Sequence, residues 1–477
     1  MIARCLETRH DIFEASADLH KGAANGGYVI MSYRSLKSVL LACSGAAVLL
    51  AASTAANAGG FAVREQSAAG QGSSFAGIAA GGALSSMYWN PATMTQFEGK
   101  AFEANVTGIF PNVSHSYTAS SLATLSPALY GSAPSNSGEA AAVPATYSSW
   151  QVTEKLWLGM SINSPVGLAV TFPGNWAGTG YGQSASVRTL NASPSLAYKI
   201  NDMISVSAGV QIQWMSVGYN QFTTPAAPTA NMAIIGGSGY GYGFTLGATI
   251  TPMPGTVIGI GYRSAINQKI SGTLTTSAVL PLTTTGDVNT TLNLPDQLSI
   301  GLRQRFLDRW TFLAGFEFAN WARIGTATIN QSSGAPATLG GTAITLPFQY
   351  SNGYFYSVGL EYAALPNLTL RTGIAYEKSP ITDSVRTPRL PDNDRMWYSI
   401  GATYQAPQRG LSFDVGYSYI DVKSTPINLG PGSGNPWTNS SGVYVGSVSA
   451  NIHIFSVAAR YQWDAPVRAT RTALITK

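Results

Sequence analysis

The sequence predicts an all-β protein, a transmembrane antiparallel β-barrel of about 14 strands with an N-terminal hatch in its lumen. Three observations lead to this fold class. Runs of roughly ten residues alternate apolar with small or polar side chains. The connections between the runs alternate between tight turns and long segments. Charged residues make up only 10% of the chain, against roughly 25% in soluble proteins. Because lipid offers backbone groups no hydrogen bonds, strands that cross a membrane must close into a barrel.

Residues 31–58 have the composition of a signal peptide. Basic residues precede an apolar stretch at 39–52, and Ala56-Asn57-Ala58 is a small-x-small cleavage site. We therefore expect the mature chain to begin at Gly59 and to be exported to the outer membrane.

Residues 1–30 carry mixed charge and no apolar run, so we expect translation to start at Met31. A lipoprotein site at Cys43 is the alternative. The apolar stretch before Cys43 is only three residues long, whereas an export signal needs about 7–15. Cys5 and Cys43 both precede Gly59, so the mature chain would contain no cysteine and could form no wrong disulfide in an oxidising compartment.

The segment at 59–98 follows the signal and is rich in glycine, serine and alanine, with no period of two. It is too weakly apolar to be a barrel strand. Because the turn pattern starts the first strand on the periplasmic side, we expect this segment to fold up into the lumen as the hatch.

From residue 99 to residue 463 the alternation predicts the strands of the barrel, an even number as in single-chain bacterial barrels. They are expected near 99–110, 142–153, 155–165, 187–200, 203–217, 238–251, 255–268, 290–304, 310–322, 350–364, 367–378, 395–407, 410–422 and 448–463. In the run at 367–378, Leu370 and Ile374 share the expected lipid face, while Arg371 and Glu377 point to the lumen. The tail at 464–477 has no assigned role.

The connections predict the orientation of the barrel. Tight turns rich in Pro, Gly, Asn and Asp are expected at 153–155, 200–202, 251–255, 364–367 and 406–410. The segments between them are long, such as 111–141, 218–237, 323–349 and 423–447. Short turns lie on the periplasmic side and long loops outside.

Two stretches carry a resemblance to a known family. The first opens with Gly59-Gly60-Phe61 and ends with Trp89-Asn90-Pro91-Ala92; the second is Arg371-Thr372-Gly373-Ile374-Ala375-Tyr376, followed by Ser379-Pro380 and by the run Leu390 to Trp397. On these motifs the chain resembles the FadL/TodX family of outer-membrane transporters for long-chain fatty acids and hydrophobic aromatics. The resemblance implies a 14-stranded barrel in outer-membrane lipid, capture of a lipophile in outer loops, transfer to a lumen pocket, and lateral exit through the wall once the hatch shifts. Its hatch residues would be Phe61, Asn90, Pro91 and Ala92.

A third stretch, 163–169, falls where the third strand of the family is kinked. Pro165 lacks an N–H and Gly167 weakens pairing, so we expect a break in the ladder that serves as a lateral gate. The alternative is that Pro165 ends the strand at the outer rim. Asn90 and Pro91 likewise have an alternative role, as a turn before the first strand.

The ligand stays open between a long-chain fatty acid and an uncharged aromatic compound. The resemblance places Gln221 and the neutral stretch 346–350 where characterised fatty-acid transporters have basic residues. The ligand-contact candidates are Phe61, Trp157, Phe172, Trp397 and Arg371. Arg371 faces the lumen, but Glu361 on the neighbouring strand can approach it diagonally as an ion-pair partner.

Other function classes find less support. A general diffusion porin is the main alternative, yet the lumen-facing residues are largely small and neutral, whereas open porins line their channel with charge. The net charge of +5 is spread without basic blocks, which disfavours nucleic acid. His115 and His453 lack a nearby Ser and acidic partner, which disfavours an enzyme. The run Asp392-Asn393-Asp394 lacks the oxygens of a calcium loop. We expect a monomer with no cofactor or metal.

Overall fold

The computed structural model describes residues 60–222, 232–277, 283–333, 344–407, 410–439 and 442–463. The expected upstream residues, signal peptide, cleavage site and C-terminal tail lie outside the described residues, as do two residues of the turn at 406–410. Within the described part, no helix has the length and apolar character needed to cross a membrane.

The described strands form one antiparallel sheet of 19 strands. They are β1 (Lys100–Ser120), β2 (Ala141–Gln151), β3 (Leu156–Asn163), β4 (Gly167–Thr171), β5 (Ser184–Lys199), β6 (Ile204–Phe222), β7 (Met232–Met253), β8 (Thr256–Arg263), β9 (Ile266–Ser277), β10 (Thr283–Leu294), β11 (Gln297–Arg305), β12 (Trp310–Ala319), β13 (Thr326–Ser333), β14 (Ile344–Pro347), β15 (Gly353–Leu365), β16 (Leu368–Lys378), β17 (Arg395–Gln405), β18 (Leu411–Leu429) and β19 (Tyr444–Trp463).

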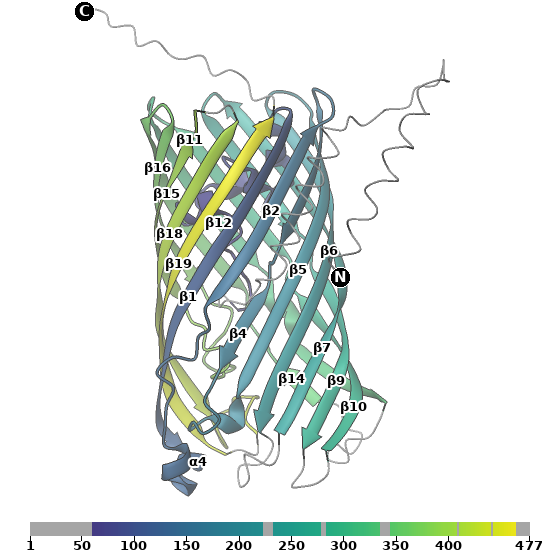
Figure 1. The fold of residues 1–477 in the computed structure, drawn as a ribbon, viewed down its shortest axis with the longest axis vertical. Coiled ribbons are helices and arrows are strands. Elements are labelled where there is room, and N and C mark those ends of the chain that lie inside the picture. The colour runs from purple at the N-terminus through teal and green to yellow at the C-terminus, as the bar shows by residue number, and fades with distance from the viewer. Residues whose placement is uncertain are drawn as a thin grey trace, which may run out of the picture. The chain divides into compact units, whose positions relative to one another are not determined.

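The sheet closes on itself, because β1 pairs with β19 from Lys100↔Trp463 onward. Three wall strands are interrupted, as β3/β4, β8/β9 and β10/β11, and the hairpin β13–β14 belongs to the connection after β12. With each interrupted pair counted as one strand, the described wall is the expected 14-stranded antiparallel barrel. Figure 1 shows the wall with short turns at one end and α4 at the other.

Several strands are longer than the sequence predicted. The ladder between β1 and β19 continues to Ser120↔Tyr444, ten residues beyond the predicted end of the first strand at Phe110. Parts of the segments predicted as outer loops are therefore wall. The apolar pattern ended the prediction early, because beyond the lipid band the outward face of a strand can be polar, as at Asn112 and Ser114.

The third wall strand is interrupted where the sequence predicted a break. β3 pairs with β5 up to Asn163↔Asn191, and β4 resumes pairing with β5 at Gly167↔Arg188. Pro165 therefore does not end the strand at the outer rim, since four further residues after Gly167 pair beyond it.

The N-terminal segment, which we define as residues 60–98, lies inside the barrel behind the front strands of Figure 1. Its short helical turns are α3 (Ala68–Gln71) and the 3₁₀ turns η4 (Ile78–Ala80), η5 (Leu84–Tyr88) and η6 (Pro91–Gln96). The outer connections add α4 (Ser121–Leu125), α5 (Pro127–Tyr130), η7 (Thr179–Tyr181) and η8 (Trp321–Ile324).

Glycines on the inner face of the wall let this segment approach closely. A Cβ at Gly261 would stand 1.8 Å from the carbonyl oxygen of Trp89, and one at Gly373 would stand 2.1 Å from that of Ser73. Any larger residue would push the backbone of the segment away. These contacts give one physical reason for glycine in the wall.

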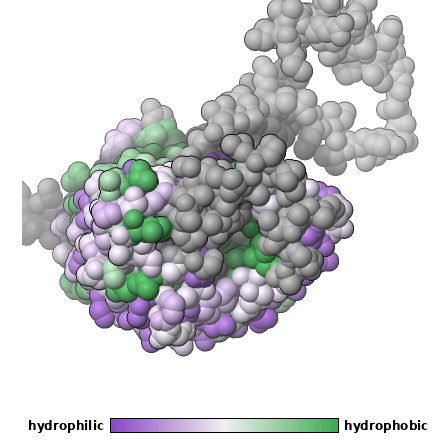
Figure 2. Space-filling view, turned by 90° about the horizontal axis from the view of Figure 1, so that it is seen from below, coloured by the Kyte–Doolittle hydropathy of each residue, from purple (hydrophilic) through white to green (hydrophobic). Residues whose placement is uncertain are grey.

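The outward face of the wall is apolar where it meets lipid. Leu370 and Ile374 on β16 are exposed, as predicted, and so are Ile400 on β17 and Val457 on β19. The end of the barrel that carries α4 is instead largely hydrophilic, with separate hydrophobic patches, in Figure 2. The described wall thus presents an apolar face suited to lipid, and a ligand site is to be sought in the lumen that it encloses.

Candidate functional site

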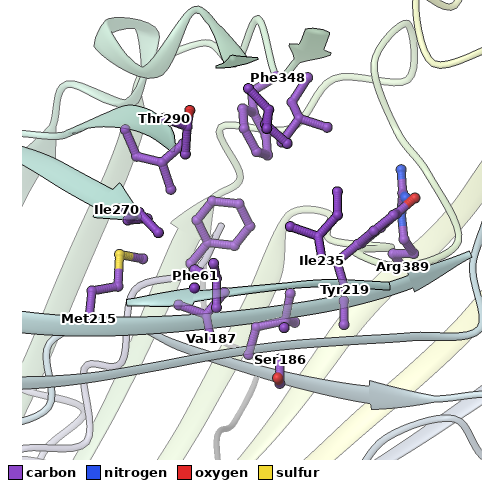
Figure 3. A pocket seen from close by; sticks show the side chains of 18 of the residues that line it. Phe61, Ser186, Val187, Met215, Tyr219, Ile235, Ile270, Thr290, Phe348 and Arg389 are labelled. Atoms are coloured by element: carbon purple, nitrogen blue, oxygen red, sulfur yellow. The ribbon is translucent and has the colours of Figure 1, made fainter. Parts of the chain in front are cut away.

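An apolar cavity lies in the lumen towards the end of the barrel that carries the long connections. We call it the outer cavity; its volume is about 150 Å³. Its lining comes from the N-terminal segment, from β4–β7, β9, β10, β13 and β14, and from three loops. Figure 3 labels Phe61, Ser186, Val187, Met215, Tyr219, Ile235, Ile270, Thr290, Phe348 and Arg389. A dry apolar cavity of this size can take a benzene ring, so it suits part of a lipophilic molecule.

Arg389 is the only charged side chain among the described residues that line the outer cavity. It comes from the loop between β16 and β17. Its guanidinium lies 4.6 Å from the ring centre of Tyr219 and 4.9 Å from that of Trp437. Burial lowers the pKa of Arg389 to about 9, so it stays cationic at neutral pH. A cation on an otherwise apolar wall can bind an anionic end of a ligand.

Phe61 links the outer cavity to the N-terminal segment. Its ring lines the cavity, as Figure 3 shows. It contacts Trp321, Phe348 and Tyr350 edge-on or tilted, with ring centres 5.6, 5.7 and 5.9 Å away. Four aromatic rings thus fix the start of the segment at the floor of the cavity.

The same segment fills the break in the third wall strand. Ala62 pairs with Val166 as an antiparallel bridge. The backbone N–H of Val63 donates to the carbonyl oxygen of Pro165 at 2.9 Å, and that of Gly167 donates to the carbonyl oxygen of Phe61 at 2.8 Å. Backbone groups that the wall leaves unpaired at the break therefore find partners in the N-terminal segment.

Side chains complete the junction at the break. The amide of Gln66 donates to the carbonyl oxygens of Val63 and Ser164. On the wall side, the hydroxyl of Thr189 accepts from the N–H of Val166 at 3.0 Å and donates to its carbonyl oxygen at 2.6 Å. The break is thus a specific junction of backbone and side chains.

A cluster of buried charges holds the start of the N-terminal segment. Arg64 forms an ion pair with Glu317 and lies 3.6 Å from Glu377. Asp392 accepts from the backbone N–H of Gly60 at 3.0 Å. The neighbouring Glu65 is 1% exposed, and neither of its carboxylate oxygens has a hydrogen-bond partner among the described residues.

Asn90, Pro91 and Ala92 lie at the other end of the segment. The side-chain amide of Asn90 donates to the carbonyl oxygens of Ala79 and Ala248, each at 2.8 Å, and its oxygen accepts from the N–H of Ala92. Pro91 opens the turn η6, where a missing N–H costs nothing. Asn90 both caps this turn and connects the segment to β7.

Four predicted ligand-contact residues do not line the outer cavity and are engaged elsewhere. Trp157 donates to the carbonyl oxygen of Phe97, and Trp397 donates to Glu377. Phe172 stacks on Trp176 with ring centres 4.5 Å apart.

The fourth, Arg371, forms an ion pair with Glu361 at 2.8 Å. The predicted cross-strand partner is confirmed, but the two residues stand directly opposite in the register and are not diagonal. A charged pair of this kind is satisfied without a ligand.

Other predicted constellations are also satisfied within the protein. Asp392 and Asp394 accept from Ser379, from its hydroxyl and its backbone N–H respectively. In the described part of the chain, no cluster of His, Cys, Asp and Glu has the spacing to hold a metal ion. His115 contacts the hydroxyl of Ser137, and His453 that of Tyr417.

Sequence reasoning missed Arg389. The loop that carries it was singled out for Ser379-Pro380 and for the motif that starts at Leu390, and not for Arg389. The available signal was three arginines within ten residues, Arg386 and Arg389 in the loop and Arg395 at the start of β17, because such a density of cations is unusual at buried positions. Leu346, Phe348 and Tyr350 of the neutral stretch 346–350 line the cavity, as the resemblance predicted. The side chain of Gln221 lies outside the described residues.

Comparison with known proteins agrees with this arrangement. A protein of Salmonella typhi named long-chain fatty acid transport protein is 28% identical over 410 residues, which cover 80% of this chain and 91% of the relative. Outer membrane protein P1 of Haemophilus influenzae is 26% identical, covering 79% of this chain and 89% of the relative.

Two solved structures share the fold. A Pseudomonas aeruginosa FadL homologue has a TM-score of 0.74 at 22% identity, covering 84% of this chain and 99% of the homologue. The toluene transporter TodX of Pseudomonas putida has a TM-score of 0.65 at 16% identity, covering 85% and 100%. The family described as outer membrane protein transport protein (OMPP1/FadL/TodX) matches residues 49–463. The chain belongs to this family of outer-membrane transporters of hydrophobic compounds.

Proposed function

We propose that the protein takes up a hydrophobic compound by holding it in the outer cavity and releasing it sideways through the break in the third wall strand. The observation that carries the proposal is the dual role of the N-terminal segment. Its Phe61 ring lines the cavity, while its backbone from Phe61 to Val63 fills the break at Pro165 to Gly167. A ligand that displaces Phe61 therefore loosens the plug of the break in the same movement.

Lateral exit also avoids the free-energy cost of moving an apolar molecule through water. An apolar molecule that leaves through the wall enters the hydrocarbon of the bilayer without crossing water. While the break is closed, its backbone groups have partners. When it opens, those groups need water or ligand to satisfy them, so the open state is transient unless a ligand stabilises it.

The lining supports a long-chain acid as the ligand. The relatives named long-chain fatty acid transport protein suggest this class. A fatty acid needs an apolar tunnel for its chain and one cation for its carboxylate, and Arg389 supplies that cation in a cavity lined otherwise by neutral side chains. An uncharged aromatic hydrocarbon, the other class, has no carboxylate to pair with Arg389.

The N-terminal segment would be the hatch. Asn90 ties its far end to β7 and the turn at Ala79, so the start of the segment can move while the end stays fixed. A lumen that the N-terminal segment fills in this way supports a transporter over the general diffusion porin.

The test replaces both Pro165 and Gly167 by valine. Valine in place of Pro165 adds an N–H, and both substitutions favour strand pairing, so the break should narrow. Initial uptake of a long-chain fatty acid should fall at least about fivefold, while binding to purified protein and the amount of folded barrel in the outer membrane stay unchanged.

The matched control is Pro144→Val, a proline on β2 that sits in a regular ladder opposite Val106. It should leave uptake unchanged. Normal uptake by the double variant at equal abundance would place the exit elsewhere, and a route downward past the N-terminal segment would then be the better account.

A further inference from the structure

A second, smaller cavity lies next to the break in the third wall strand. It is lined by Ala62 of the N-terminal segment, by Pro165 and Val166 at the break, and by Arg263 at the end of β8. We call it the inner cavity, because its β6 lining is nearer the periplasmic turn than that of the outer cavity. Its volume is about 30 Å³, room for a water molecule or two.

Neighbouring residues of the same two backbone segments line the outer and inner cavities. Phe61 and Leu168 line the outer cavity, whereas Ala62 and Val166 line the inner one. Ala62 and Val166 form the bridge that fills the break. The displacement of the N-terminal segment that the proposed function requires would therefore join the two cavities.

Arg263 is a buried cation held only by neutral groups. It is 6% exposed. One guanidinium nitrogen donates to the carbonyl oxygen of Tyr88 at 3.0 Å, another donates to Gln211 at 2.5 Å, and the guanidinium lies 4.4 Å above the Tyr88 ring. Two hydrogen bonds use two of its five N–H donors.

Five other arginines of the lumen differ from Arg263 in having an acidic partner. These arginines are Arg64, Arg303, Arg371, Arg395 and Arg460. Among the residues that the structure describes, no carboxylate comes within ion-pair distance of Arg263. A buried cation without a counter-charge is costly, and an anion that reaches it removes that cost.

We propose that Arg263 is an anion-binding station on the exit route, which receives the carboxylate end of an amphiphile as it passes from the outer cavity to the break. The proposal rests on the proposed function, because the inner cavity has room for a head group only after the N-terminal segment moves. Arg389 in the outer cavity binds the carboxylate first, and Arg263 binds it next. The planar guanidinium suits two parallel hydrogen bonds to a carboxylate.

The test compares a long-chain fatty acid with the primary alcohol of the same chain length. Arg263→Gln removes the charge but keeps a side-chain amide donor, and Arg263→Lys keeps the charge. Initial uptake of the acid should fall about tenfold relative to the alcohol in R263Q, the size of one lost charge-assisted hydrogen bond. R263K should keep most of the preference for uptake of the acid over the alcohol. Equilibrium binding of the acid should change less than about twofold in both variants.

Several outcomes would contradict the proposed anion-binding role of Arg263. If Arg263 only fastens Tyr88, or only holds an inorganic anion such as chloride, R263Q should slow acid and alcohol equally. Equal effects of R263K and R263Q would count against a charge-dependent role in the same way.

The test also separates the station from the exit. The double variant of Pro165 and Gly167 could block uptake of acid and alcohol alike, while R263Q slows both compounds equally. That result would support lateral exit at the break and contradict the anion-binding role of Arg263. The double variant could instead transport normally, while R263Q still slows the acid more than the alcohol. That result would contradict exit at the break and support the anion-binding role of Arg263.

Discussion

The backbone N–H of Gly167 donates to the carbonyl oxygen of Phe61 at 2.8 Å, so one hydrogen bond joins the edge of the wall break to the residue whose ring forms the floor of the outer cavity. A ligand that moves the backbone of Phe61 together with its ring would withdraw this acceptor from the wall. Because an unpaired buried backbone donor is costly, the proposed function predicts that occupancy of the cavity and closure of the break are energetically coupled.

Replacing Phe61 by Ala should weaken that coupling. The variant loses the ring contacts to Trp321, Phe348 and Tyr350, a change that costs about 3–5 kcal/mol in a packed core. We expect faster hydrogen exchange at residues 61–66 and weaker ligand binding, with the barrel still assembled. Exchange detected by mass spectrometry on the detergent-solubilised protein measures the first effect.

Phe97→Ala is the matched control, since Phe97 packs at the far end of the N-terminal segment beneath the Arg460 guanidinium. It should leave exchange at 61–66 at the parent rate. Unchanged exchange in the Phe61 variant would mean that the aromatic cluster does not hold the start of the segment.

Arg389 should determine how strongly the protein prefers a long-chain acid over an uncharged ligand. Arg389→Gln removes the only charged group among the described lining residues. The dissociation constant of a long-chain acid should rise about 10- to 100-fold, as for one charge-assisted hydrogen bond of about 1.5–3 kcal/mol. The affinity for an alkylbenzene should stay within about twofold, as isothermal calorimetry with both ligands can measure.

Thr387→Val is the control for this change, because Thr387 lines the same cavity from the same loop without carrying charge. If Arg389→Gln weakened both ligands equally, the arginine would shape the cavity through Tyr219 and Trp437 and would not recognise a head group.

The barrel could be predicted from the sequence because lipid imposes a local rule on every strand. Leu370 and Ile374 had to alternate with Arg371 and Gly373 whatever the rest of the chain did. The break at Pro165 could be predicted for the same local reason, since a missing N–H interrupts a ladder.

The lining of the outer cavity could not be predicted in this way. Arg389 and Trp437 come from two separate loops and Tyr219 from β6, and no local pattern brings them together. The aromatic candidates Trp157 and Trp397 were chosen for their lumen-facing phase, but the N-terminal segment covers that part of the lumen, so they pack against it.

Deleting residues 59–94 should leave an assembled barrel that leaks polar solutes. The wall keeps its own ladder, closed by the pairing of β1 with β19, and its lipid-facing band. The deletion removes the backbone that packs against Gly261 and Gly373 and would open an aqueous path. Single-channel conductance in a planar bilayer should rise well above that of the parent, and a deletion variant as tight as the parent would refute the hatch.

Glu65 should make the docking of the N-terminal segment depend on pH. The pKa of Glu65 is raised to about 7, mainly by burial and also by the nearby Glu377, while Arg64 and Arg395 act in the opposite direction. In the undocked segment the carboxyl would have its usual pKa near 4.5. The docked form holds the proton more tightly, so the free energy of docking is most favourable below pH 4.5. It becomes less favourable as the pH rises from 4.5 through 7, by up to roughly 3 kcal/mol.

Glu65→Gln should therefore flatten this dependence. The amide is neutral at every pH, so the docked segment no longer meets the cost of burying a charge above pH 7. Hydrogen exchange at residues 61–66, corrected for the intrinsic effect of pH, should rise between pH 5 and pH 8 in the parent and stay level in the variant. Glu98→Gln, an exposed carboxyl at the other end of the segment, should behave as the parent. A slope that persists in Glu65→Gln would assign the pH dependence to the neighbouring cluster of Asp392, Arg395 and Glu377.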